Sequence, residues 1–152
     1  MQKKGDNGEA IAKLMFEMAK LEVPIIAIVI GEGSSGGALA LGVGNKVLML
    51  ENAIYSILSP EGYSSILWKD SSRYKEAAEK MKLTAKDLYD LKIIDKIIKE
   101  PEGEGAFEKI AGNLKKEIKS SISEMNSKSK EQIVEERYCK FRNMGEYIKL
   151  EN

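Results

Sequence analysis

Residues 23–43 read VPIIAIVIGEGSSGGALALGV, and this stretch decides the fold class. The β-branched run at 25–30 is typical of a strand that is covered on both faces, as in a parallel sheet. The glycine-rich turn that follows leads into 38–43, an apolar segment without a charged residue, which predicts a buried helix. A strand, a glycine turn and a helix in this order indicate an α/β protein.

Charge divides the chain into two parts. Only three charged residues occur in 23–60, whereas charged residues are frequent from residue 61 onward. We therefore expect one domain over 1–152, with the strand-containing core in 1–103 and a helical layer in 104–152. Apolar spacing and capping residues predict helices at 9–21, 85–92, from 104, from 129 and after Ser59, and strands at 25–30, 46–50, 54–58 and 93–98.

Composition excludes several kinds of chemistry. The chain has 152 residues, no histidine, one cysteine (Cys139) and equal numbers of basic and acidic side chains, 24 of each. Without histidine there is no Ser-His-Asp system and no histidine-ligated zinc, and one cysteine forms neither an internal disulfide nor a thiolate cluster. We expect a cytoplasmic protein without a metal, because the N-terminus is not a signal peptide and the apolar run at 23–31 is too short to cross a bilayer. A neutral chain offers no overall field for nucleic acid or a membrane surface.

The glycine-rich turn matches a dinucleotide fingerprint in form. Gly31, Gly33 and Gly36 spell GxGxxG, and Glu51 lies 20 residues beyond Gly31. We disfavour this interpretation because 38–43 has no polar face, and the strand at 46–50 leads almost directly into the next one. The phosphate-loop alternative fails because no Lys-Ser or Lys-Thr follows the glycines.

The backbone of the turn suggests a different site. Gly36 and Gly37 lie where a helix begins, so their N–H groups have no partner within the helix and no side chain shields them. Two such donors that converge form an oxyanion hole. The alternative is that these glycines only allow close packing, and the pattern alone leaves both interpretations open.

Other residues invite weaker interpretations. Ser35 is a candidate nucleophile only if it is paired with a lysine, of which Lys46 is the nearest in sequence, and we favour helix capping for the Ser34 and Ser35 hydroxyls. Glu61 is typical of a first-turn acid. Tyr63 and Trp68 could line a ligand or partner surface or merely pack, and we expect Cys139 to be a small, partly buried apolar residue without activation.

Two motifs carry a resemblance to a known family. GEGSSGGALA at 31–40 and SPEGYSSILWK at 59–69 resemble the α subunit of the bacterial acetyl-CoA carboxylase carboxyltransferase, and the likeness continues through 91–101 to near Arg137. The resemblance implies a partial crotonase/ClpP-like ββα superhelix that corresponds to the C-terminal half of that subunit. Residues 1–8 do not follow the family pattern, and Ser34 stands where many members have glycine.

The resemblance also implies a mechanism and partners. Gly36 and Gly37 would supply the backbone oxyanion hole, and together with Gly33, Ser34 and Ser35 they would bind carboxybiotin. The reaction would move the carboxyl group from biotin to acetyl-CoA and give malonyl-CoA for fatty acid synthesis. It would require a β subunit with a zinc ribbon and an acetyl-CoA site, a biotin carboxyl carrier protein and the missing N-terminal half.

Three alternatives remain at this point. The chain could be a non-catalytic interaction module of that complex, a subunit of a biotin-dependent acyl-CoA decarboxylase, or a crotonase-fold serine peptidase that uses Ser35 and a lysine. Because half of a superhelix leaves sheet edge and core uncovered, we also expect association between α chains or poor solubility.

Overall fold

A three-stranded parallel sheet lies at the centre of the computed structural model, which describes residues 7–145. Its strands are β1 (Ile26–Val29), β3 (Lys46–Leu50) and β5 (Lys96–Ile98), in the order β1-β3-β5. The register pairs Ile28 with Leu48 and Leu48 with Lys96. The middle strand β3 is the most buried of the three, with Val47 to Leu50 buried, as expected for a strand with neighbours on both sides.

A second, smaller sheet joins the glycine-rich turn to the chain after β3. It consists of β2 (Glu32–Ser34) and β4 (Ile54–Ser56), which are parallel and pair Gly33 with Tyr55. The sequence analysis placed only a turn at β2, because a Glu-Gly-Ser segment has no strand pattern of its own. Pairing with β4 makes it a strand.

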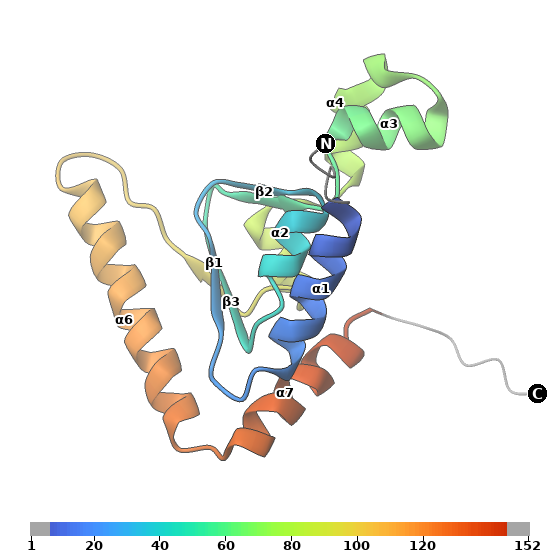
Figure 1. The fold of residues 1–152 in the computed structure, drawn as a ribbon. Coiled ribbons are helices and arrows are strands. Elements are labelled where there is room, and N and C mark those ends of the chain that lie inside the picture. The colour runs from blue at the N-terminus through green and yellow to red at the C-terminus, as the bar shows by residue number, and fades with distance from the viewer. Residues whose placement is uncertain (1–6, 146–152) are drawn as a thin grey trace, which may run out of the picture.

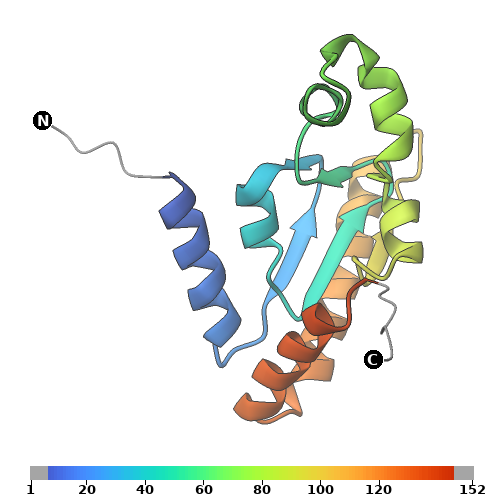
Figure 2. The same cartoon turned by 90° about the vertical axis from the view of Figure 1, so that its right-hand side faces the viewer.

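Helices cover both faces of the central sheet (Figures 1 and 2). In Figure 1 the long helix α6 lies on one side of the sheet, while α2 lies on the other side with α1 against it. The segments α3, η1 and α4 pack against one another and form a lobe at one end of the molecule. The helices are α1 (Asn7–Lys20), α2 (Ser35–Leu41), α3 (Pro60–Trp68), the 3-10 helix η1 (Ser71–Arg73), α4 (Tyr74–Lys80), α5 (Ala85–Asp90), α6 (Ala106–Asn126) and α7 (Lys130–Arg142).

Three of the predicted helices begin at capping residues. The Ser59 hydroxyl accepts a hydrogen bond from the Gly62 N–H at 3.2 Å, and the Thr84 hydroxyl accepts one from the Asp87 N–H at 3.3 Å. Ser129 forms a complete capping box with Gln132 at the start of α7. These helix starts are confirmed because a cap depends only on residues three positions apart.

Several predictions about burial and length were wrong. The strand at 25–30 was expected to be fully buried between two covered faces, but the side chains of β1 are only half-buried, and Ile30, beyond its end, is 69% exposed. The segment 38–43 was expected to be a buried helix, but the helix α2 ends at Leu41, which is 62% exposed, and Ala40 is the only buried residue of α2, while Gly42 and Val43 are buried beyond its end. The strand at 93–98 is reduced to β5, since the N–H groups of Ile93 and Ile94 bind the Leu88 carbonyl. The strand at 54–58 ends at Ser56, and η1 and α4 were not predicted.

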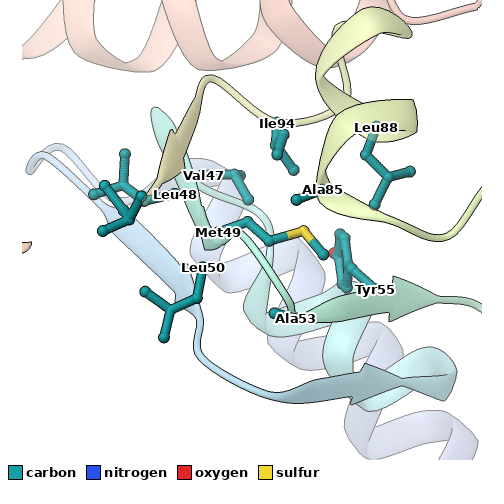
Figure 3. Packing of buried hydrophobic residues seen from close by; sticks show 10 residues of the cluster. Val47, Leu48, Met49, Leu50, Ala53, Tyr55, Ala85, Leu88 and Ile94 are labelled. Atoms are coloured by element: carbon teal, nitrogen blue, oxygen red, sulfur yellow. The ribbon is translucent and has the colours of Figure 1, made fainter. Parts of the chain in front are cut away.

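One cluster of apolar side chains joins the two sheets to α5 (Figure 3). It contains Val47, Leu48, Met49, Leu50, Ala53, Tyr55, Ala85, Leu88, Ile94 and Ile98. In Figure 3 the Met49 side chain points from the central sheet toward the Tyr55 ring of β4. The core therefore extends from β3 to the small sheet beside the glycine-rich turn.

A buried arginine connects the two ends of the described chain. Arg137 of α7 is 1% exposed, and its guanidinium donates hydrogen bonds of 2.8–3.2 Å to four carbonyl groups at the end of α1 and in the loop that follows, those of Met18, Ala19, Leu21 and Val23. Burial lowers the pKa of Arg137 from its usual value. These bonds satisfy the last carbonyls of α1, which have no partner within the helix.

Asn45 is the second member of this buried network. Its side-chain oxygen accepts hydrogen bonds from Arg137 Nη2 at 2.8 Å and from the Ile25 N–H at 3.1 Å, and its amide donates to the Ile133 carbonyl at 2.8 Å. Lys140 of α7 forms an ion pair with Asp95, whose carboxylate also accepts from the Val47 N–H at 2.6 Å. The last helix is thereby bonded to the segments that begin β1 and β3.

Replacing the buried arginine tests this network. We expect Arg137→Met to lower the free energy of unfolding by about 3 kcal/mol, because it leaves buried carbonyl groups and the Asn45 oxygen without their donor. Urea unfolding followed by circular dichroism measures the loss. The exposed Arg142 of the same helix provides the control, and Arg142→Met should change stability by less than about 0.5 kcal/mol. Equal effects of the two substitutions would contradict the role given to Arg137.

Candidate functional site

The glycine-rich turn lies where β2 ends and α2 begins. Ser34 is the N-cap of α2, with extended backbone angles, and its side chain makes no capping hydrogen bond. Ser35 follows with φ 71°, a left-handed conformation that is costly for a residue with a side chain. This unusual angle turns the chain from the small sheet into the helix and so directs the N–H groups of the next two residues.

Gly36 and Gly37 keep their N–H groups free within the described residues 7–145. They occupy the first turn of α2, where no carbonyl of the same helix is available, and no hydrogen bond to another part of the described chain reaches them. Both residues are half-buried rather than enclosed. Two adjacent backbone donors are therefore open to an acceptor from outside the chain.

Packing accounts for some glycines of this region but not for all. A Cβ atom at Gly33 would lie 3.1 Å from Tyr55 Cδ2, and one at Gly42 would lie 2.2 Å from the Tyr55 hydroxyl oxygen. A Cβ at Gly36 would only touch Ile11 of α1, at 3.5 Å, and one at Gly37 would have no atom within 4 Å. Close packing thus explains Gly33 and Gly42, whereas it gives no reason for glycine at position 37.

A hollow of about 440 Å³ lies between the β1 segment and α2. Its walls are mostly apolar and come from Ala27, Ile28, Val29, Ile30, Gly31, Glu32, Gly33, Ala38, Leu41, Gly42 and Tyr55. Of the five residues predicted to bind carboxybiotin, only Gly33 lines this hollow. Ser34, Ser35, Gly36 and Gly37 lie beside it along the chain, at the start of α2.

The structure does not show the helix capping that the sequence analysis favoured for the serine hydroxyls of the turn. Neither serine side chain caps α2, and the Ser34 hydroxyl instead lies 3.4 Å from the Ser56 hydroxyl on the neighbouring strand. Lys46, the lysine considered as a partner for Ser35, forms an ion pair with Glu124 at 3.1 Å. Lys46 lies at the start of β3, whereas the glycine-rich turn follows the end of β1. The two are therefore at opposite ends of the parallel sheet.

Two acidic residues singled out in the sequence lie apart from the glycines. Glu51 pairs with Lys99 and accepts a hydrogen bond from the Glu100 N–H, and these two contacts lower the pKa of its carboxyl group. Glu51 therefore links the end of β3 to the end of β5. Its carboxylate is already paired and is not the unpaired acid that a dinucleotide-binding site would need. Glu61 is exposed in the first turn of α3, as expected.

The aromatic pair of α3 packs within its own lobe. The rings of Tyr63 and Trp68 meet edge to face with centroids 5.6 Å apart, and the Arg73 guanidinium lies 4.2 Å from the centroid of the Trp68 ring. The two rings therefore pack against each other, as the packing interpretation predicted. Cys139 is exposed rather than partly buried, and a hydrogen bond with Glu135 raises the pKa of its thiol, so the thiol is not activated.

Tyr55 and Ile11 adjoin the glycine-rich turn but were missed by the sequence analysis. Tyr55 is 8% exposed, its hydroxyl donates a hydrogen bond to the Ala38 carbonyl at 3.3 Å, and burial raises the pKa of that hydroxyl. Ile11 of α1 contacts the turn at Gly36. No local signal identifies either residue, because each reaches the turn from an element that only the fold brings near.

Comparison with known proteins places the chain in a family. The family model described as acetyl co-enzyme A carboxylase carboxyltransferase-like matches residues 2–145. The chain belongs to this family. The acetyl-coenzyme A carboxylase carboxyl transferase subunit alpha of Clostridium botulinum (strain Alaska E43 / Type E3) is 58% identical over 141 residues, which are 91% of this chain and 51% of the relative. The subunit of the same name from Staphylococcus saprophyticus is 55% identical over 142 residues, 91% of this chain and 45% of the relative.

Two consequences follow from membership of the carboxyltransferase family. The resemblance inferred from the two motifs is confirmed, and the residues that carry them lie within the matched range. The chain spans about half the length of the curated relatives that it matches.

Solved structures support the predicted fold. Transcarboxylase 12S, in a hexamer structure with methylmalonyl-coenzyme A and methylmalonic acid bound, matches with a TM-score of 0.65 at 19% identity, over 84% of this chain and 24% of that one. A Pseudomonas malonate decarboxylase hetero-tetramer in complex with coenzyme A matches with a TM-score of 0.65 at 14% identity, over 90% and 57% of the two chains. The predicted crotonase-like α/β fold is thus confirmed. Among the described residues, no helix is long and apolar enough to cross a membrane.

The left-handed serine offers a direct test of the geometry of the turn. We expect Ser35→Gly to raise the free energy of unfolding by about 0.5–1 kcal/mol, because glycine adopts φ 71° without steric cost. Ser34→Gly is the matched control, since φ at Ser34 is −134°, and it should lower stability by a similar amount. Urea midpoints of the two variants measure the difference, and stabilisation by both or by neither would show that Ser35 is not strained.

Proposed function

We propose that this chain supplies the biotin-facing part of a carboxyltransferase that moves a carboxyl group from carboxybiotin to acetyl-CoA and forms malonyl-CoA. The family to which the chain belongs is biotin-dependent. The observation that supports placing this function at the glycine-rich turn is the glycine at position 37. Neither a neighbouring atom nor a left-handed φ requires glycine there, whereas a Cβ would stand beside an unpaired N–H group.

The chemistry proposed for the glycines is electrostatic. Biotin, when bound, carries the carboxyl group, and its ring nitrogen takes the proton that the acetyl methyl group loses. The Gly36 and Gly37 N–H groups would donate hydrogen bonds to the ureido oxygen, on which negative charge grows as the carboxyl group leaves. Gly33, Ser34 and Ser35 would form the adjoining backbone of the site. No protein general base is needed, which agrees with a chain that contains no histidine.

The proposed function needs further protein, in agreement with a chain that spans about half the length of its relatives. We propose that acetyl-CoA is bound by a β subunit, that biotin arrives on a carrier protein, and that α chains associate. The remaining half of the relatives' length would complete the sheet beside β1. The multi-chain assemblies named for the two structural neighbours, a hexamer and a hetero-tetramer, support a function exercised in a complex.

A reconstitution experiment tests the activity. The chain is mixed with a β subunit, a carboxylated biotin carrier and, as a separate polypeptide, the part of the Clostridium botulinum relative outside the match. We expect malonyl-CoA to form from acetyl-CoA and expect no product when the 152-residue chain is omitted. Assembly of the complex without product would favour the interaction module instead.

Gly37→Ala separates catalysis from folding. We expect turnover to fall by about 100-fold or more, because the new methyl group blocks approach to the N–H donors. The free energy of unfolding should stay the same or rise by about 0.5 kcal/mol, since alanine is the better helix former.

A second helical glycine provides the control for this substitution. Gly112 lies in α6, and a Cβ there would also have no atom within 4 Å. Gly112→Ala should therefore give a comparable gain in stability with unchanged turnover. Full turnover in the Gly37→Ala variant would defeat the proposed role of these amides.

A further inference from the structure

Tyr55 contacts the chain on both sides of the two candidate glycines. It is the middle residue of β4, it pairs with Gly33 of β2, and its N–H donates a hydrogen bond to the Leu83 carbonyl at 3.1 Å. The side chain is buried at the end of the core cluster, where Met49 points toward it (Figure 3). Its position is thus set by the core as well as by the pairing of β4 with β2.

The ring occupies space that two glycines leave open. Its Cδ2 atom is 3.1 Å from the place of a Cβ at Gly33, and its hydroxyl oxygen is 2.2 Å from the place of a Cβ at Gly42. Gly33 precedes the helix α2 and Gly42 ends it. Tyr55 therefore packs against the chain on both sides of the short segment that contains Gly36 and Gly37.

The hydroxyl group adds a directed contact to this packing. It donates to the Ala38 carbonyl at 3.3 Å, and the same carbonyl accepts the Gly42 N–H at 3.0 Å. Ala38 immediately follows Gly37. A helix of seven residues is not stable in isolation and depends on tertiary contacts, of which this hydrogen bond is a directed one on the residue next to Gly37.

Tyr55 also separates two hollows. It lines the hollow of about 440 Å³ beside β1 and a second one of about 300 Å³ that is bounded by residues of α2, β4, the lobe and α5. The ring is a shared wall, so its removal would loosen the support of α2 from both sides.

From these contacts we infer that Tyr55 is a positioning residue, which holds α2 in the orientation that aims the Gly36 and Gly37 N–H groups at one acceptor. This inference rests on the proposed function of the two glycines. Tyr55 itself touches no reacting atom in this scheme. A tyrosine hydroxyl is protonated at neutral pH and can donate, and burial raises its pKa further from the ordinary value of 10.0.

Nuclear magnetic resonance of the full 152-residue chain tests the positioning directly. Tyr55→Phe removes the bond to the Ala38 carbonyl and keeps the ring. In a chain labelled with ¹⁵N-glycine we expect the amide resonances of Gly36, Gly37 and Gly42 to shift, while that of Gly112 in α6 stays in place.

The matched control is Tyr89→Phe, because Tyr89 lies in α5 and is 48% exposed. This variant should leave all these glycine resonances unchanged. Unmoved Gly36 and Gly37 resonances in the Tyr55→Phe chain would overturn the inference.

A double substitution guards against a trivial loss of folding. Gly42→Ala places a methyl group against the Tyr55 hydroxyl and should lower the urea midpoint. In the Tyr55→Phe background the nearest ring atom is Cζ, at 3.2 Å from that methyl position, so the same change should cost less than half as much. Additive effects of the two substitutions would show that the hydroxyl does not support α2 at this point.

Activity of the reconstituted complex separates the two claims. Tyr55→Phe should lower kcat by about tenfold and leave KM for acetyl-CoA unchanged, because only the direction of the transition-state donors is altered. Loss of turnover in Gly37→Ala with a normal kcat in Tyr55→Phe would defeat the positioning role alone. Normal turnover in Gly37→Ala would defeat the proposed function, and the glycine resonances would still decide whether Tyr55 orients α2.

Discussion

The hydrogen bonds of one buried guanidinium hold the fold together. Arg137, near the end of the described chain, binds carbonyl groups 114 to 119 residues earlier and shares Asn45 with the start of β1. Because a buried charged donor without partners is costly, α7 and α1 are fixed relative to the sheet. The position of α1 in turn places Ile11 against Gly36. The hydrogen bonds of Arg137 at one end of the molecule thus help to position, through α1, the candidate site at the other end.

The candidate site is the place where local preference and observed conformation disagree. Ser35 adopts a left-handed angle, and a helix begins with two glycines although alanine would stabilise it more. Steric contact explains Gly33 and Gly42, and it does not explain Gly37. Such local costs are expected where a backbone group must remain accessible to a ligand. The disagreement supports the proposal that a ligand binds at the Gly36 and Gly37 amides, which the family resemblance also selected.

Several large apolar side chains are exposed near this site and on the lobe. Ile30 and Leu41 are mostly exposed near the glycine-rich turn, and so are Ile66 and Leu67 on the lobe. Within the described residues, β1 has no strand partner on its outer edge. Open sheet edges and apolar patches are typical of surfaces that pack against further protein. They agree with a chain that spans about half the length of its relatives.

The sequence by itself determined the α/β class, the caps at Ser59, Thr84 and Ser129, the long helix α6 and, through two motifs, the family. These features depend on residues a few positions apart, so a linear pattern contains them. Only the tertiary structure decided that β1 is an edge strand among the described residues, that the N–H groups of Ile93 and Ile94 bond back to Leu88 instead of extending β5, and that Arg137 and Tyr55 support the site. Each of these depends on atoms that are distant in sequence, and the free energy of burying them arises only when the folded chain brings them together.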